Sequence, residues 1–523
     1  MAVVTAAWRA VDTATMSKRH PPRAVMVWGT SSGAGKSLLA TALCRWAARQ
    51  GIAVAPFKAQ NMSNNARVVP GLDGTNLGWG EIGAAQYFQA LAARVVPSVD
   101  MNPVLLKPER DTASQVVLHG TVAAELSALP WRERSAHLAV AARESFARLR
   151  SKHELIVIEG AGSPAEINLA AHDYVNLETA RWARDSSQLR SLLVTDIDRG
   201  GAFAHLYGTW QLLPNDLRPS LAGFVLNKFR GDARLLAPGP QELQALTGVP
   251  TLAVLPMQRH HGLPEEDGVY DAAGPAWTES ASASEGLRIA IVAYPHISNL
   301  DEFQALRQLP GVRLRWARSA ADLDGAQWII LPGSKQVSGD VAWLRAQGLE
   351  QPLRRHAAAG RPLLGICGGL QMLGTALHDP DGVDGEAGPP QPGLGLLAVH
   401  TRYAAPKRVC AQAAQFDTLA APWQALSGAA ADGYEIRTGV TALDHGHHAQ
   451  ALTTPALRGA QGDAIGWQCG PVLGVYLHGM FESPTVVRAL FGQSMPTLDD
   501  NLDGLADLVE AGFGADRLRW LCG

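Results

Sequence analysis

The feature that most constrains the fold is residues 361–374, which read R-P-L-L-G-I-C-G-G-L-Q-M-L-G. The apolar start predicts a short buried strand, and a helix-like stretch follows Cys367 at once. A nucleophile at such a turn sits on a strained backbone, which the small neighbours in the pattern G-x-C-x-G at 365–369 permit. A helix N-terminus also favours thiolate over thiol. The segment therefore predicts an α/β domain with Cys367 as nucleophile; the alternative is a buried cysteine packed beside a glycine turn.

A general base for this cysteine is predicted much later in the chain. Residues 472–479 read V-L-G-V-Y-L-H-G, an apolar strand that delivers His478 to its end. A thiolate needs a base within hydrogen-bond reach, and Cys–His pairs are distant in sequence but adjacent in the fold. A lone histidine is more often a satisfied core or surface residue, but two elements of one domain that each end in a reactive residue favour the catalytic pair Cys367 and His478.

The segment L-P-G-S at 331–334 offers backbone N–H groups at the end of another predicted strand. Donors aimed at the developing negative charge of a tetrahedral intermediate stabilise it. We therefore predict an oxyanion hole formed by the N–H groups of Gly333, Ser334 and Gly368.

Residues 23–37 predict a phosphate-binding loop, because a strand over 25–28, a Gly- and Ser-rich loop and a helix over 38–50 follow one another. In such a loop, backbone N–H groups surround the phosphates, Lys36 neutralises their charge and the Ser37 hydroxyl ligates magnesium. Five residues separate the flanking glycines, where the common pattern has four. The predicted nucleotide-binding residues here are Gly29, Thr30, Gly33, Gly35, Lys36 and Ser37.

The loop after the next strand is rich in amides and contains Lys58, Asn61 and Asn64. Ligands of open α/β sheets bind beyond the carboxyl ends of the strands. These three side chains are therefore predicted to contact substrate or phosphate; the alternative is a solvated loop with capping asparagines.

Three more strands end in polar residues, at Glu159, Asp198 and Asn227. Glu159 is predicted to be the second magnesium anchor beside Ser37, since a half-buried carboxylate without a cation is costly. Asp198 is predicted to contact substrate or phosphate, and Asn227 to contact the nucleotide through an adenine edge. Five strands that alternate with helical stretches predict a doubly wound parallel sheet.

The size of the chain, 523 residues, requires more than one core. The boundaries follow from composition and pattern: an N-terminal extension over 1–22, a nucleotide-binding α/β domain over 23–270, a linker over 271–286, a second doubly wound α/β domain over 287–490 and a helical tail over 491–523. Residues 1–22 lack the apolar core of a signal peptide, and either Met1 or Met16 starts translation.

Composition excludes several classes of protein. The net charge of −3 is not the excess of positive charge that a nucleic-acid-binding protein carries. No stretch approaches the roughly 20 apolar residues of a membrane span. Five scattered cysteines without a C-x-x-C motif indicate a reducing compartment with no disulfide framework. A cytoplasmic protein without nucleic-acid or membrane partners is predicted, and the oligomeric state stays open.

The motifs also carry a family resemblance. L-P-G-S, G-I-C-G-G and L-H-G (477–479) resemble a class I glutamine amidotransferase domain, while the longer phosphate loop resembles dethiobiotin-synthetase-like ATPases. From residue 23 to about 490, the chain resembles the cobyric acid synthase family. The further motifs that carry this resemblance are P-F-K-A-Q-N-M-S-N-N from residue 56, E-G-A-G-S-P-A-E-I-N-L from 159, D-I-D-R-G-G from 196 and N-K-F-R-G-D from 227.

The resemblance implies a small corrinoid substrate, ATP, Mg²⁺, and glutamine as the ammonia donor. It implies amidation of the b, d, e and g carboxylates of adenosylcobyrinic acid a,c-diamide in cobalamin biosynthesis. Cys367 would form a thioester with glutamine, ATP would activate each carboxylate as an acyl phosphate, and Lys58, Asn61 and Asn64 would stabilise it. Competing hypotheses are cobyrinic acid a,c-diamide synthase, another glutamine-dependent carboxylate amidase, and a non-catalytic P-loop switch.

One position departs from the resemblance. Many glutaminases of this class carry Glu two residues after the catalytic histidine, where this chain has Met480. Glu482 and Glu435 are therefore candidates for the acid that orients His478, and a Cys–His dyad is the remaining alternative.

Overall fold

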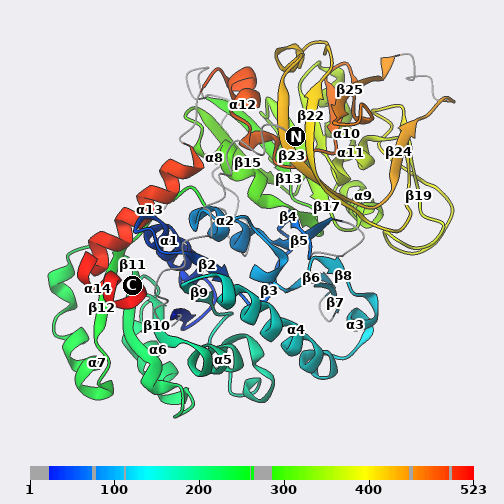
Figure 1. The fold of residues 1–523 in the computed structure, drawn as a ribbon. Helices are drawn as coiled ribbons and strands as arrows, with labels where there is room; N and C mark the ends of the chain where they lie inside the picture. The colour runs from blue at the N-terminus through cyan, green and yellow to red at the C-terminus, as the bar shows by residue number, and fades with distance from the viewer. Residues whose placement is uncertain are drawn as a thin grey trace.

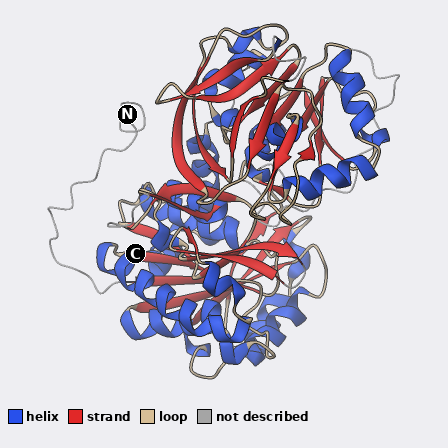
Figure 2. Cartoon of the chain, turned by 90° about the vertical axis from the view of Figure 1, so that its right-hand side faces the viewer, coloured by secondary structure: helices blue, strands red, loops and turns tan. Residues whose placement is uncertain are grey.

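The computed structural model describes residues 23–72, 78–110, 113–258, 261–263, 286–446, 452–493 and 497–523. The predicted N-terminal extension and nearly all of the predicted linker lie outside these residues. The described chain forms two lobes, each built on a central β-sheet with helices packed against it (Figures 1 and 2).

The N-terminal sheet is parallel, with the strand order β12-β11-β10-β1-β9-β2. It confirms the predicted doubly wound α/β fold and adds one strand, β12, to the five that were predicted. The strands are β1 (Arg23–Gly29), β2 (Val54–Phe57), β9 (Leu155–Glu159), β10 (Gln188–Asp196), β11 (Leu221–Phe229) and β12 (Thr251–Pro256).

Alternate residues of each strand face opposite sides of this sheet, so two cores form. In β1, Met26 and Trp28 pack with the helices of one face, and Val25 and Val27 pack with those of the other. The first face carries α4 (Trp131–Lys152), α5 (Thr179–Ser186), α6 (Ala202–Leu212) and α7 (Gly239–Thr247); the second carries α1 (Lys36–Arg49) and α2 (Ala84–Ala92).

Two small sheets lie between β2 and α4 in the sequence. One has the order β3-β6-β7-β8, and the other is the hairpin β4-β5, whose strands contact β22 of the second lobe. The strands of the two small sheets are β3 (Gln60–Met62), β4 (Ala66–Pro70), β5 (Trp79–Gly83), β6 (Val104–Arg110), β7 (Ala113–Leu118) and β8 (Thr121–Val122). Strand β22 spans Arg408–Phe416.

The C-terminal lobe contains a mixed sheet with the order β15-β13-β16-β18-β27-β26-β25-β22-β23. The half from β15 to β27 is parallel, as the predicted α/β pattern requires, whereas the strands beyond β27 are antiparallel and were not predicted. The strands are β13 (Leu287–Val292), β15 (Val312–Ala317), β16 (Trp328–Leu331), β18 (Leu363–Ile366), β23 (Ala430–Arg437), β25 (Thr454–Gly459), β26 (Ala464–Cys469) and β27 (Val472–Val475).

After α12 (Pro484–Phe491) the chain returns to the N-terminal lobe through α13 (Leu498–Phe513) and α14 (Ala515–Cys522). Helix α13 lies along α1, where Nε of Arg45 donates to Asp503 at 2.8 Å and Nε1 of Trp46 donates to Glu510 at 2.8 Å (Figure 1). The tail therefore shares the core of the N-terminal lobe rather than that of the lobe that precedes it.

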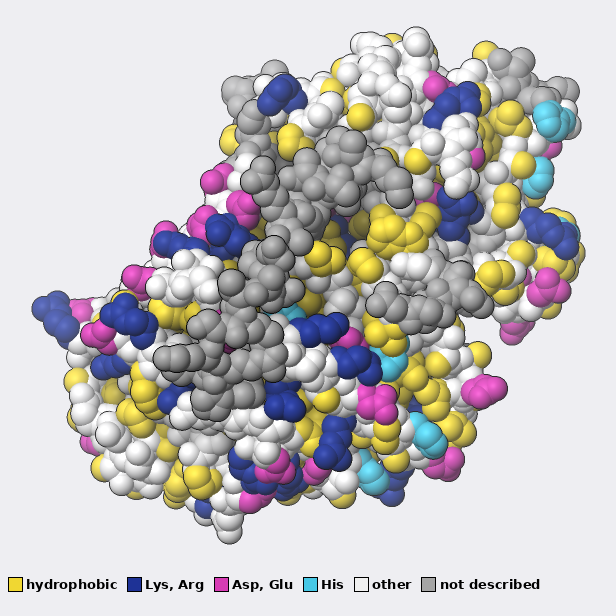
Figure 3. Space-filling model, viewed as in Figure 1, with side chains coloured by type: hydrophobic (Ala, Val, Ile, Leu, Met, Phe, Trp, Pro, Cys, Tyr) yellow, Lys and Arg dark blue, Asp and Glu magenta, His cyan; other side chains and the backbone are white. Residues whose placement is uncertain are grey.

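Among the helices of the described ranges, none is long and apolar enough to cross a membrane. On the face drawn in Figure 3, basic and acidic side chains are interspersed over both lobes. This mixture matches the small net charge of the chain.

Candidate active site

Cys367 lies between β18 and the short helix α11 (Gly368–Leu373), at the carboxyl end of the parallel half of the sheet. Its φ is 52° and its ψ is −105°, a conformation that non-glycine residues rarely adopt. A Cβ atom on Gly369 would lie 1.9 Å from the carbonyl oxygen of Leu331, and one on Gly365 would lie 2.7 Å from the backbone of Gly369. The pattern G-x-C-x-G is therefore required by close backbone approach around the strained cysteine.

His478 reaches Cys367 because β27 pairs in parallel with β18, so the two strands end side by side. The thiol and the imidazole are close enough for the charge of Cys367 to raise the pKa of His478, and Sγ of Cys367 donates to the carbonyl oxygen of Ile436 at 3.4 Å. Both side chains are buried, with 6% of Cys367 and 1% of His478 exposed. The structure thus brings the two predicted residues together in a site that excludes bulk water.

The other ring nitrogen of His478 faces Glu302, a residue that the sequence analysis did not identify. Nδ1 lies 3.2 Å from Oε1 of Glu302, and the other carboxylate oxygen accepts the N–H of Gly479 at 3.3 Å. Burial alone lowers the pKa of His478, but the charges of Glu302 and Cys367 outweigh burial and raise this pKa to about 10. The geometry is that of a cysteine–histidine–carboxylate triad.

Neither acid proposed from the sequence has this role. Glu482 pairs with Arg67 at 3.0 Å, and Glu435 pairs with Arg437 at 2.7 Å. Met480 is fully buried in the hydrophobic core of its lobe. The signal that identifies Glu302 is its position beyond β13, because the carboxyl ends of parallel neighbours lie at one edge of the sheet.

The three predicted oxyanion-hole residues lie together beside this triad. Gly333 and Ser334 form β17 (Gly333–Ser334), which pairs with β14 (Ile297–Ser298). A Cβ atom on Gly368 would lie 2.7 Å from the backbone nitrogen of Ser334, and one on Gly333 would lie 3.2 Å from Cε1 of His478. The backbone of Gly333 therefore lies against His478, and that of Gly368, the residue after Cys367, lies against Ser334.

The phosphate loop lies at the carboxyl end of β1 and leads into α1. Gly35 has a φ of 102°, and a Cβ atom there would lie 1.9 Å from Nδ2 of Asn227. Nζ of Lys36 donates to the carbonyl oxygens of Ser31 at 3.0 Å and Gly162 at 3.1 Å, so the side chain lies across the loop. Such a loop presents backbone N–H groups and a cation to the same ligand.

Asn227 contacts this loop differently from the prediction that it reads an adenine edge. Its Nδ2 donates to the carbonyl oxygen of Ala34 at 3.0 Å and is buried there. The residue holds the backbone of the loop from the end of β11. Thr30 shares a hydroxyl hydrogen bond of 3.0 Å with Thr195 of β10.

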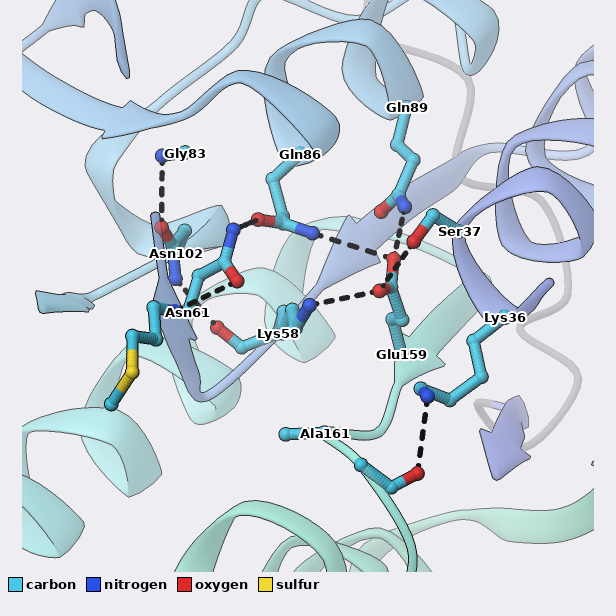
Figure 4. Close-up of polar contacts among 12 residues, drawn as sticks. Lys36, Ser37, Lys58, Asn61, Gly83, Gln86, Gln89, Asn102, Glu159 and Ala161 are labelled. Carbon is cyan, nitrogen blue, oxygen red and sulfur yellow. Dashed lines mark hydrogen bonds and ion pairs between the residues drawn. The ribbon is translucent and has the colours of Figure 1, made fainter. Parts of the chain in front are cut away.

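Glu159, at the end of β9, is fully buried and is the centre of a polar cluster (Figure 4). Oε1 accepts from the hydroxyl of Ser37 and from Nζ of Lys58, both at 2.9 Å. Oε2 accepts from Gln86 at 3.4 Å and from Gln89. The two glutamines were missed, although their i, i+3 spacing in a segment expected to be helical places them on one helix face.

The remaining predicted residues divide between this cluster and its surroundings. Nδ2 of Asn61 donates to Oε1 of Gln86 at 3.2 Å, which joins Asn61 to the cluster. Oδ1 of Asn64 is buried without a hydrogen-bond partner among the described residues. Asp198 instead forms an ion pair with Arg230 and is part of a separate group at the ends of β10 and β11.

The residues around Glu159 fit a magnesium ion beside a nucleotide phosphate. Magnesium prefers oxygen ligands, usually one or two protein groups together with phosphate oxygens and water. The hydroxyl of Ser37 and the carboxylate of Glu159 supply such oxygens 2.9 Å apart, and the ammonium of Lys58 already contacts the same carboxylate as a cation.

Comparisons with known proteins agree with both lobes. Residues 25–267 match the CobQ/CobB/MinD/ParA nucleotide binding domain, and residues 288–486 match the CobB/CobQ-like glutamine amidotransferase domain. The cobyric acid synthase of Methylibium petroleiphilum is 63% identical over 96% of this chain and 97% of its own. The cobyric acid synthases of Leptothrix cholodnii and Variovorax paradoxus are 61% and 58% identical, over 96% and 95% of this chain and 98% and 99% of their own. At such identity over almost the full length of each protein, the chain belongs to the cobyric acid synthase family.

Proposed function

We propose that this chain is a glutamine-hydrolysing amide ligase that converts adenosylcobyrinic acid a,c-diamide into adenosylcobyric acid. It amidates the b, d, e and g side-chain carboxylates in cobalamin biosynthesis. One observation carries the proposal: a single chain combines a cysteine–histidine–carboxylate triad with a phosphate loop and a buried carboxylate at the next strand end. Carboxylates are poor electrophiles, so an amide ligase needs both an ammonia source and ATP.

The glutaminase half of the reaction uses Cys367, His478 and Glu302. The thiolate attacks the side-chain amide of glutamine, and the imidazolium of His478 donates a proton to the departing ammonia. Water then hydrolyses the thioester, with His478 accepting its proton, and glutamate is released. Backbone N–H groups of Gly333, Ser334 and Gly368 stabilise the oxyanion in both steps.

The synthetase half uses the loop around Lys36 and the cluster around Glu159. The substrate carboxylate attacks the γ-phosphate of ATP, which gives an acyl phosphate and ADP; ammonia then displaces phosphate and gives the amide. Lys36 neutralises charge on the transferring phosphoryl group, and Lys58, Asn61 and Asn64 bind substrate or phosphate. Mg²⁺ held by Ser37 and Glu159 would supply further charge stabilisation.

A path for ammonia between the two lobes is part of the proposal, because ammonia released to water would be lost to the reaction. The lobes are joined by ion pairs, including Nζ of Lys407 with the buried Glu81 at 2.6 Å. A reducing, cytoplasmic location is also proposed, since all five cysteines are unpaired.

Mass spectrometry of adenosylcobyrinic acid a,c-diamide incubated with enzyme, ATP, Mg²⁺ and glutamine tests the proposal. We expect four successive replacements of a carboxyl OH by NH₂. Cys367→Ala should abolish them with glutamine and retain them with ammonium chloride. If Cys367→Ala uses ammonium no better than glutamine, the ammonia path is wrong. Amidation of cobyrinic acid at the a and c positions would favour the diamide synthase, and glutamate and ADP formation without a corrinoid product would refute the substrate.

A further inference from the structure

Arg67 is a buried arginine of the ATP-binding lobe whose charge is neutralised by the other lobe. It lies on β4 and is 2% exposed. Its Nε donates to Oδ2 of Asp301 at 2.6 Å, and its NH1 donates to Oε2 of Glu482 at 3.0 Å. The ring of Tyr434 lies 5.2 Å from the guanidinium carbon. The proposed chemistry of phosphoryl transfer does not use this residue.

The segment that Arg67 contacts is the one that carries the third member of the triad. Asp301 and Glu302 are neighbours in the short 3₁₀ helix Leu300–Phe303. Beside Arg67, the carbonyl oxygen of Ala66 accepts from Asn299 at 2.9 Å, and Oδ1 of Asn65 accepts the N–H of Leu300 at 2.9 Å. Three consecutive residues of one lobe therefore hold the three residues that precede Glu302 in the other.

A second set of contacts runs from the same arginine to His478 through Tyr434. The Tyr434 ring is stacked on the imidazole, with centroids 5.3 Å apart and an interplanar angle of 19°. The two residues also pair through their backbones, and the Tyr434 hydroxyl accepts from Asn299. The groups that face His478 are thus Cys367, Glu302 and Tyr434, and two of these three are positioned by contacts with residues 65–67.

We propose that Arg67 is a positioning residue for the glutaminase: through Asp301 and Tyr434 it fixes Glu302 against His478, so that the synthetase lobe completes the glutaminase triad. This inference rests on the proposed glutaminase function. It also links the two sites by a short stretch of chain, because Lys58 and Asn61 at the Glu159 cluster precede Arg67 by only a few residues.

The chain offers a matched control in Arg45. It is also buried, at 1% exposed, and is also paired with two carboxylates, Asp499 and Asp503. These contacts join α13 to α1 and involve no residue of the glutaminase lobe. Both partners of Arg45 are exposed, at 74% and 41%, so the two sites share a buried arginine rather than a buried ion pair. A loss of activity caused only by a missing buried arginine would therefore be shared by variants at positions 45 and 67.

The experiment compares Arg67→Met, Arg67→Lys and Arg45→Met in the full chain. Glutamate release from glutamine is measured between pH 6 and pH 10.5, and ATP-dependent corrinoid amidation is measured with glutamine and with ammonium chloride. Displacement of a catalytic group by about 1 Å costs about 100-fold in rate. We expect Arg67→Met to lose about that factor in kcat of glutamate release, with ammonium-dependent amidation retained and Arg45→Met unaffected in glutamate release.

The pH profile of glutamate release distinguishes loss of the positioning role of Arg67 from general destabilisation of the protein. If Glu302 moves away, the pKa of His478 falls, so the alkaline limb of glutamate release should move to lower pH in both position-67 variants. Arg67→Lys keeps the charge but loses the two-pronged geometry, so its profile decides the question even where Arg67→Met does not fold. An unchanged alkaline limb in Arg67→Lys, or equal losses with glutamine and ammonium, would overturn the inference. Failure of the wild-type enzyme to amidate the corrinoid would instead overturn the proposed substrate and leave the glutamate-release test intact.

Discussion

Replacing Glu302 by Gln tests whether its carboxylate raises the pKa of His478, the histidine proposed to be catalytic. The substitution removes a negative charge 3.2 Å from Nδ1 of His478 and keeps the shape of the side chain. At an effective dielectric constant of about 20, two unit charges at this distance attract by about 5 kcal/mol, which corresponds to between about 3 and 4 pKa units. The pKa of His478, raised to about 10 in the native protein, should therefore fall to about 6.5.

The consequence is a loss of the protonated imidazole that the departing ammonia requires. With a pKa near 6.5, about 3% of His478 would be protonated at pH 8, so glutamate release should fall about 30-fold at that pH and recover as the pH is lowered. The assay is glutamate release from glutamine across this pH range, with Glu435→Gln as the control. Glu435 is equally buried but pairs with Arg437, so its replacement should leave the alkaline limb in place. A Glu302→Gln enzyme with the wild-type alkaline limb would refute the triad.

Stability should depend on pH through the same histidine. The pKa of His478 in the folded protein lies above its unfolded value of about 6.5, so protonation of this residue stabilises the fold fully below that pH. The stabilisation is lost as the pH rises through about 10. The melting temperature should therefore decline between pH 6 and pH 10.5, and it should decline less in Glu302→Gln. Gly369→Ala should destabilise the protein by about 1–3 kcal/mol in denaturant titrations and lower glutamate release, because the added methyl would overlap a backbone carbonyl. Glu159→Gln should abolish ATP-dependent amidation with both glutamine and ammonium, measured as corrinoid mass change, while retained synthetase activity would exclude the metal-anchor role. Arg45→Met should lower the free energy of unfolding by about 1–2 kcal/mol in denaturant titrations, because it loosens the contact of α13 with α1. An unchanged denaturation midpoint would show that the ion pair contributes nothing.

The parts of the two sites that could be predicted from the sequence are those specified by contiguous residues. A phosphate loop is formed by one strand, one glycine-rich turn and one helix, so its pattern in residues 23–37 contains the geometry that forms it. The same holds for Cys367, because the glycines at 365 and 369 are the ones whose missing side chains allow the strained turn. At both sites, the contiguous residues that supply the chemical groups also determine the backbone conformation.

Glu302 could not be assigned in the same way, because its role depends on which strands are neighbours in the sheet. The acid contributes to the triad because β13 lies beside β16, which lies beside β18, whereas the sequence separates β13 from β27 by the rest of the lobe. The antiparallel extension and the return of α13 to α1 also depend on long-range pairing. In α13, the apolar positions Leu502, Leu505 and Val509 predict a buried helix face without indicating which lobe buries it.

The position of the third triad member changes what can control the glutaminase. An acid two residues after His478 would stand at position 480, where the side chain is buried in the hydrophobic core of its own lobe. Glu302 instead follows Asp301, which binds an arginine of the ATP-binding lobe. Glu302 lies 3.2 Å from Nδ1 of His478, and residues 65–67 of the other lobe contact the three residues that precede it. Placing the orienting acid there makes the charge on the catalytic histidine depend on contacts that both domains must form.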